Sequence, residues 1–190
     1  MGRVEIPGED PSGDEVPSFL SDLMVLTKVR LSFLVDCFHT MLGTALAAFS
    51  AAALNQSYEG EVDARMERTR DRPVPAGRMD SGKVFRLGVW LGVTGVIYLT
   101  GFSGWGTAVL GALTIVIYVW VYTPMKQRSF AGVYVGAVSG ALPPLMGWVA
   151  AEGKNWWGGV VLFCVLLFWQ MPHFFAIAWL FRDEFESAGM

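Results

Sequence analysis

Long stretches of this chain carry almost no charge, and this feature limits its fold more than any other. Residues 84–151 contain three charged side chains, Arg86, Lys126 and Arg128, and residues 155–181 contain none. A soluble domain carries charge on about a quarter of its residues, whereas only 16% of this chain is charged. A lipid bilayer accommodates such stretches, because about 20 apolar residues span its hydrocarbon core. The sequence therefore predicts an all-α fold, a polytopic membrane helix bundle.

Five segments are long and apolar enough to cross a membrane. The run over 86–123 is too long for one crossing, and Gly101, Gly104 and Gly106 offer a turn that divides it. Small residues are frequent in these spans and let membrane helices approach closely. We expect five transmembrane helices, over 31–54, 86–103, 105–123, 130–151 and 157–181.

The charge that the spans lack is concentrated in the loops. Segment 55–83 holds six Lys/Arg and six Asp/Glu, and the loop 124–129 holds Lys126 and Arg128. Short loops rich in Lys and Arg stay on the cytoplasmic side of a membrane. With the spans above, these two loops lie on the same side, and we expect that side to be the cytoplasm.

The first span conflicts with this topology. Lys28 and Arg30 precede it and the basic segment 55–83 follows it, so one crossing cannot place both ends in the cytoplasm. Asp36 also lies inside the span, at a cost of about 3 kcal/mol on insertion scales, which pairing with His39 could partly recover. Either the segment is re-entrant or lies on the surface, or sequence is missing here. We expect residues 24–54 to be kinked, tilted or poorly packed.

The rest of the composition narrows the domain organisation and the function. Residues 1–23 are acidic and aperiodic and predict a disordered tail, which leaves 24–190 as the membrane domain with 55–83 as its charged loop.

A net charge of −3 provides no basic field for nucleic acid. The two cysteines, Cys37 and Cys164, lie in apolar runs, and their spacing fits neither a disulfide framework nor a zinc site.

The polar segment after the first span carries the strongest chemical signal. Asn55, Glu59 and Asp63 are spaced i, i+4, i+8 and share one face of a helix. One amide and two carboxylate oxygens suit Mg²⁺, which shares its ligand shell with phosphate oxygens. Arginines can grip such phosphates through bidentate hydrogen bonds, and the set that follows is Arg65, Arg68, Arg70 and Arg72. A metal-bridged diphosphate fits this pattern; the alternative is a solvated helix with salt bridges, whose arginines only set the topology.

Two further clusters are functional candidates with simpler alternatives. The segment Tyr122–Arg128 places Lys126 and Arg128 on the same predicted side as the first cluster, although positive-inside bias alone explains basic residues there. His173 lies inside the last apolar span, where an ionisable residue is a functional candidate by default. A histidine hydrogen-bonded between helices is the alternative for that position.

Four segments, in this order, resemble one known family. They are LNQSYEGEVDARMERTRDRPVPAGR, YTPMKQR, GALPPLMGW and FWQMPHFFAIAW, and they are similar to the UbiA-type intramembrane prenyltransferases, in particular to a heme-farnesylating branch. The resemblance covers residues 24–30 and 39–190. It implies a helical fold around a cavity and Mg²⁺-dependent transfer of a farnesyl group from farnesyl diphosphate to a vinyl group of heme b, which gives heme o for terminal oxidases.

The resemblance also implies roles for individual residues. It implies that Asn55, Glu59 and Asp63 hold Mg²⁺ and diphosphate, and that His173 lies on the heme side. The diphosphate contacts that it implies are Arg68, Arg72, Lys126 and Arg128. It further implies a multi-pass protein of a bacterial inner (plasma) membrane, with the lipid bilayer, farnesyl diphosphate and heme b as partners and an association with heme a synthase or oxidase assembly.

The chain departs from the family pattern in ways that keep other functions open. The family chain has a segment near residue 35 and helices after the last motif that this sequence lacks, so we expect an internally deleted and C-terminally shortened member with a partial UbiA-type fold. Gly132 stands where the pattern has Asn. The alternatives are a UbiA-type enzyme for an aromatic or quinone-precursor acceptor, an inactive truncated homologue, and a transporter fragment.

Overall fold

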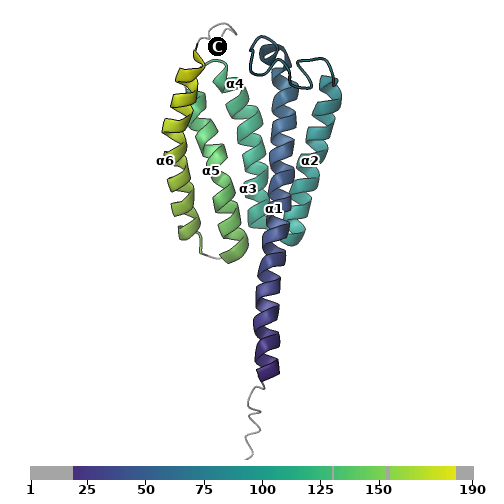
Figure 1. Cartoon of the computed structure of the whole chain (residues 1–190), viewed down its shortest axis with the longest axis vertical. Coiled ribbons are helices and arrows are strands. Elements are labelled where there is room, and N and C mark those ends of the chain that lie inside the picture. The colour runs from purple at the N-terminus through teal and green to yellow at the C-terminus, as the bar shows by residue number, and fades with distance from the viewer. Residues whose placement is uncertain (1–18, 130, 153–154, 183–190) are drawn as a thin grey trace, which may run out of the picture. The chain divides into compact units, whose positions relative to one another are not determined.

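The computed structural model describes residues 19–129, 131–152 and 155–182, and these residues form helices and connecting loops (Figure 1). The chain divides into two compact units, residues 1–34 and 35–190, and the second contains the bundle. The elements are α1 (Phe19–Asp63), α2 (Ser81–Phe102), α3 (Trp105–Val116), the π-helix η1 (Ile117–Tyr122), α4 (Thr123–Lys126), α5 (Ala131–Glu152) and α6 (Trp157–Leu180).

The five predicted spans are confirmed, so this is a multi-pass membrane protein. Helices long and apolar enough to cross a bilayer cover Leu31–Asp63, Ser81–Phe102, Trp105–Lys126, Ala131–Ala151 and Trp157–Leu180. In lipid every backbone polar group must be satisfied within the chain, and the helix does this for each span. The predicted turn is also present, because Gly104 takes a positive φ of 86° between α2 and α3, a conformation that glycine adopts without strain.

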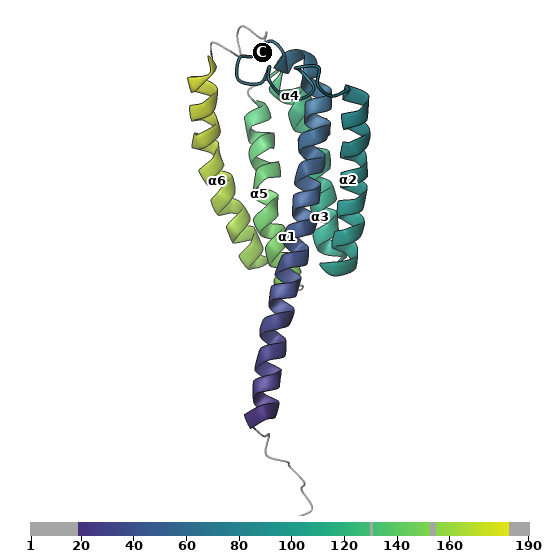
Figure 2. The ribbon, with the colours of Figure 1, turned by 45° about the vertical axis from the view of Figure 1, so that its right-hand side comes forward.

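Helices α1 and α2 lie side by side in both ribbon views (Figures 1 and 2) and pack through small residues. A Cβ placed on Gly88 would lie 2.7 Å from the Leu54 Cγ, and one on Gly92 would lie 2.7 Å from the Ser50 Oγ. This close approach lets the Ser50 hydroxyl donate a 2.8 Å hydrogen bond to the Gly88 carbonyl. Small residues at the contact are what membrane helices need, since lipid gives no hydrophobic force that drives them together.

The first predicted span is partly as expected. Helix α1 continues through it without a break, so the re-entrant alternative is wrong. Over 35–38 only Cys37 is even half-buried, which confirms the expected poor packing there. Farther along, α1 contributes Ala47, Ala51 and Leu54 to a buried cluster with Ile115 and Val119, so the expectation is wrong for that part of the helix.

His39 contacts α2 instead of Asp36, the partner considered for it from the sequence. Its Nδ1 shares a hydrogen bond with the Tyr98 hydroxyl, and its ring stacks on Phe102 with 4.3 Å between centroids. Residues 1–18 of the predicted tail lie outside the described part of the chain, and the assignment of 24–190 as one domain stays a prediction.

The two charged loops lie at one end of the bundle, as predicted. The segment that follows α1 and the short helix α4 both lie at the upper end in the two ribbon views. The Lys126 Nζ lies 2.7 Å from the Glu59 Oε2, and this ion pair directly joins the two charged segments. The cytoplasmic location of this end stays a prediction.

The close packing of α1 on α2 makes a testable prediction. We expect Gly88→Ala to destabilise the protein by about 1–3 kcal/mol, because the new methyl group overlaps Leu54. Gly101→Ala is the matched control in the same helix, since no atom lies within 4 Å of its Cβ position. Thermal unfolding in detergent should show a lower Tm for Gly88→Ala alone, and equal Tm values for both variants would contradict this packing.

The shared end of the two loops makes a second prediction. In a background in which Cys37 and Cys164 are replaced, single cysteines at the exposed positions Arg78 and Ser129 should react with an impermeant maleimide from the same side of sealed vesicles. A cysteine at Trp105, beside the turn between α2 and α3, should react only from the opposite side. Labelling of Arg78→Cys and Ser129→Cys from opposite sides would show that the spans are assigned wrongly.

Candidate functional site

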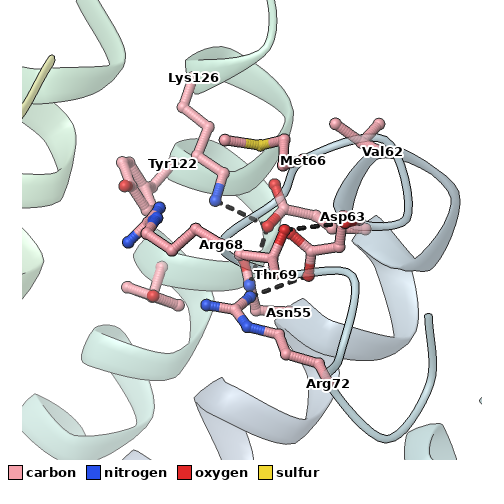
Figure 3. Close-up of a pocket in the computed structure, with 11 residues that line it drawn as sticks. Asn55, Val62, Asp63, Met66, Arg68, Thr69, Arg72, Tyr122 and Lys126 are labelled. Carbon is pink, nitrogen blue, oxygen red and sulfur yellow. Dashed lines mark hydrogen bonds and ion pairs between the residues drawn. The ribbon is translucent and has the colours of Figure 1, made fainter. Parts of the chain in front are cut away.

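A polar cavity of about 210 Å³ lies at the end of the bundle that carries the charged loops (Figure 3). Its walls come from the last turns of α1, the segment after α1, η1 and α4. The lining residues are Asn55, Glu59, Val62, Asp63, Met66, Arg68, Thr69, Arg72, Tyr118, Tyr122 and Lys126.

Glu59 is the most buried charged group in the cavity, with 2% of its surface exposed. Its Oε2 accepts hydrogen bonds from the Lys126 Nζ at 2.7 Å and from the Asn55 Nδ2 at 2.9 Å, and its Oε1 accepts one from the Gln127 Nε2 at 3.3 Å. A buried carboxylate needs a partner of opposite charge and further hydrogen bonds. Lys126 and the two amides provide both.

Asp63, a second buried carboxylate, forms an ion pair one helical turn beyond Glu59. Its Oδ2 lies 2.8 Å from the Arg72 Nη1. The chain turns back after α1 to make this contact, and the Thr69 hydroxyl stabilises the turn by donating to the Asp63 carbonyl at 2.9 Å. Each carboxylate of the cavity is therefore neutralised by a cation from another part of the chain.

Asn55 lies on the same face of α1 as Glu59 and Asp63, and its amide contacts α4. The Thr123 Oγ1 lies 2.8 Å from the Asn55 Oδ1, and both side chains are buried. Thr123 directly follows η1, whose wider turn is closed by the hydrogen bond from the Thr123 N–H to the Tyr118 carbonyl. Turns of this π type are rare and are frequently found at functional sites.

Two tyrosines form the aromatic wall of the cavity. Tyr118 and Tyr122 lie on one side of η1 with 5.1 Å between their ring centroids. The Lys126 Nζ lies 5.3 Å from the centre of the Tyr122 ring, a cation–π distance. The Lys126 main chain in turn packs against Gly132 of α5, where a Cβ would lie 2.7 Å from the Lys126 Cα. An Asn at this position would therefore not fit the packing seen here.

The structure brings six of the predicted site residues together around the cavity, and their roles stay predictions. These are Asn55, Glu59, Asp63, Arg68, Arg72 and Lys126. Arg68 is exposed at the rim, and its guanidinium lies 5.1 Å from the centre of the Phe181 ring.

Arg128 and His173 lie outside this group. Arg128 is exposed beyond α4 and does not line the cavity. His173 is exposed on α6, where its ring stacks on Trp169 with 5.3 Å between centroids. The buried polar residue of that segment is Gln170, which packs against Gly140 of α5.

Sequence reasoning did not assign a role to Thr69, Tyr118, Thr123 or Gln127. Tyr118 carried a usable signal, because Tyr118, Tyr122 and Lys126 repeat at intervals of four residues, the spacing of one helix face. Thr69 carried none, because its contact depends on how the chain turns after α1. Thr123 and Gln127 lay within the basic cluster but contact α1, which the local sequence does not show.

The oxygen set of the cavity fits a divalent cation of the Mg²⁺ class. Among the described residues no three His, Cys, Asp or Glu side chains are grouped as metal ligands. Mg²⁺, however, is usually held by one or two carboxylates and completes its shell with water and substrate phosphates. Glu59 and Asp63 provide two carboxylates and Asn55 an amide oxygen, and the cations beside them can accept phosphate oxygens.

Comparisons with known proteins identify relatives of this chain. The chain is 43% identical over 190 residues to a protein from Anaeromyxobacter sp. (strain Fw109-5), and the match covers 90% of this chain and 64% of the relative. It is 47% identical over 157 residues to a protein from Rhodopirellula baltica (82% and 55%) and 39% identical over 195 residues to one from Myxococcus xanthus (93% and 66%). All three relatives are named protoheme IX farnesyltransferase.

The chain thus spans less than two thirds of the length of these relatives. No solved structure matches it significantly. The UbiA prenyltransferase family, described by that name, matches residues 16–190, which include all of the cavity. The chain therefore belongs to the UbiA prenyltransferase family.

Proposed function

We propose that this protein transfers a farnesyl group from farnesyl diphosphate to a vinyl group of heme b, with addition of water, to give heme o. The observation that carries the proposal is the pair of buried carboxylate–cation contacts, Glu59 with Lys126 and Asp63 with Arg72, which face one cavity. Such a site has cations for diphosphate oxygens and carboxylates for a bridging metal. The names of the relatives provide the farnesyl and heme specificity.

The residues of the cavity divide the work of releasing the diphosphate. Asn55, Glu59 and Asp63 would hold Mg²⁺, which when bound supplies positive charge to the diphosphate. Lys126, Arg72 and Arg68 donate hydrogen bonds to its oxygens as negative charge grows on them, and donors already in place stabilise developing charge most effectively. The allylic C–O bond breaks, and the diphosphate leaves with the electron pair.

The remaining steps need positioning rather than a nucleophilic side chain. The vinyl π electrons of heme b form a bond to the allylic carbon, and the cation left beside the porphyrin takes up water and loses a proton. The protein must hold the alkene against the allylic carbon and keep water away until that bond forms. The apolar Val62 and Met66 and the aromatic Tyr118 and Tyr122 form part of such a wall.

A direct test uses the full-length product of the gene, reconstituted in detergent with Mg²⁺ and farnesyl diphosphate. Heme b and an aromatic acid of the quinone-precursor class are offered in parallel reactions, and the products are separated by chromatography and weighed by mass spectrometry. Heme b should gain the mass of one farnesyl group and one hydroxyl group. Prenylation of the aromatic acid alone would assign the protein to a different acceptor, and no product from either would favour an inactive homologue.

The acidic face allows a matched comparison of two carboxylates on one helix. Asp63→Ala should lower kcat/KM at least about 100-fold, because it removes a metal ligand and the partner of Arg72. Glu61→Ala should keep full activity, because Glu61 is exposed and does not line the cavity. Initial rates of heme o formation provide the measurement, and normal rates with Asp63→Ala would refute the assignment of this site.

A further inference from the structure

The Thr123 hydroxyl lies at a branch point of the hydrogen bonds around the cavity. Its Oγ1 is 2.8 Å from the Asn55 Oδ1 and 2.8 Å from the Tyr118 carbonyl oxygen. Both neighbours are acceptors, and a hydroxyl has a single hydrogen to donate. Thr123 therefore donates to one of them at a time, and its side chain is fully buried, so water cannot serve the other.

The Tyr118 carbonyl does not depend on this hydroxyl. The wide turn of η1 brings the Thr123 N–H to the same carbonyl, which is therefore satisfied by the main chain. The hydroxyl is free to face Asn55, and it then donates to the Asn55 Oδ1 while the Asn55 Nδ2 donates to the Glu59 Oε2 at 2.9 Å. This arrangement is fully hydrogen-bonded without a metal, but it directs the NH₂ group of Asn55, which cannot bind a cation, at the carboxylate.

A half-turn of the Asn55 amide produces a second arrangement, which needs a cation to be complete. The Nδ2 then donates to the Thr123 Oγ1, and the Thr123 hydroxyl donates to the Tyr118 carbonyl. The Oδ1 takes the place of the Nδ2 beside the Glu59 Oε2. Two oxygens this close repel each other unless a cation binds both, and oxygens are the ligands that Mg²⁺ prefers.

We propose that Thr123 is a positioning residue that lets Asn55 alternate between these orientations, so that its oxygen faces Glu59 when a divalent cation binds. The Thr123 hydroxyl can donate to the Asn55 amide or accept from it. When it accepts, its own hydrogen is donated to the Tyr118 carbonyl, which the π-turn holds within reach. This inference rests on the proposed function, because it assumes that Asn55 and Glu59 share a metal. Partners that orient metal ligands typically change metal affinity by about 10–100-fold.

The test measures binding of Mn²⁺, as a probe for Mg²⁺, by electron paramagnetic resonance of the full-length protein in detergent with inorganic diphosphate. Thr123→Val removes the hydroxyl and keeps the shape, and it should raise the Kd for Mn²⁺ about tenfold. Thr123→Ser keeps the hydroxyl and should restore the affinity. Thr107→Val is the matched control, because Thr107 is also fully buried and its hydroxyl donates to a main-chain carbonyl of the turn between α2 and α3, that of Ser103, at 3.1 Å.

A second background separates positioning from a general loss of structure. In Asn55→Asp both ends of the side chain are oxygens, so there is no orientation to select, and adding Thr123→Val should change the Kd for Mn²⁺ much less than it does with Asn55 present. An unchanged Kd for Thr123→Val, or the same loss in both backgrounds, would overturn the role of Thr123 and leave the proposed function intact. Absence of Mn²⁺ binding by the unaltered protein would overturn both.

Discussion

A single buried carboxylate holds together the end of the bundle that contains the cavity. Glu59 is 2% exposed, and an unpaired charge at such a depth would cost several kcal/mol. Its hydrogen-bond partners are Asn55 on α1, Lys126 on α4 and Gln127 after it. Because these residues must converge on one carboxylate, the end of α1 and the loop before α5 have a fixed relation, and the cavity lies between them.

The same contacts give the cavity its charge balance. Two carboxylates, Glu59 and Asp63, face three cations, Arg68, Arg72 and Lys126. Without ligand each carboxylate is neutralised by one cation, Glu59 by Lys126 at 2.7 Å and Asp63 by Arg72 at 2.8 Å. A metal–diphosphate complex offers each of them a new partner of opposite charge, so the ion pairs can exchange partners without leaving a buried charge uncompensated.

Close packing of α1 against α2 fixes the position of the helix that carries Glu59. In lipid, membrane helices associate through close contact and hydrogen bonds, and Gly88 and Gly92 of α2 provide the room for Leu54 and Ser50 of α1. Leu54 directly precedes Asn55, so the packing of α1 against α2 also sets the position of the first residue of the polar face. The π-turn of η1 also helps to position Asn55, because it brings the Thr123 hydroxyl to the Asn55 amide.

The sequence by itself determined the helical fold and the polar face of α1. Five apolar runs are enough to predict five spans, and the spacing of Asn55, Glu59 and Asp63 places them on one face, because both features follow from helix geometry within a single segment. Only the tertiary structure decided which cations meet these carboxylates. Arg72 reaches Asp63 through the turn after α1, and Lys126 reaches Glu59 from 67 residues away. Arg128 follows Lys126 by two residues in the sequence, but it lies beyond the end of α4 and does not line the cavity. These pairings depend on how loops turn and helices pack, and local periodicity carries no information about either.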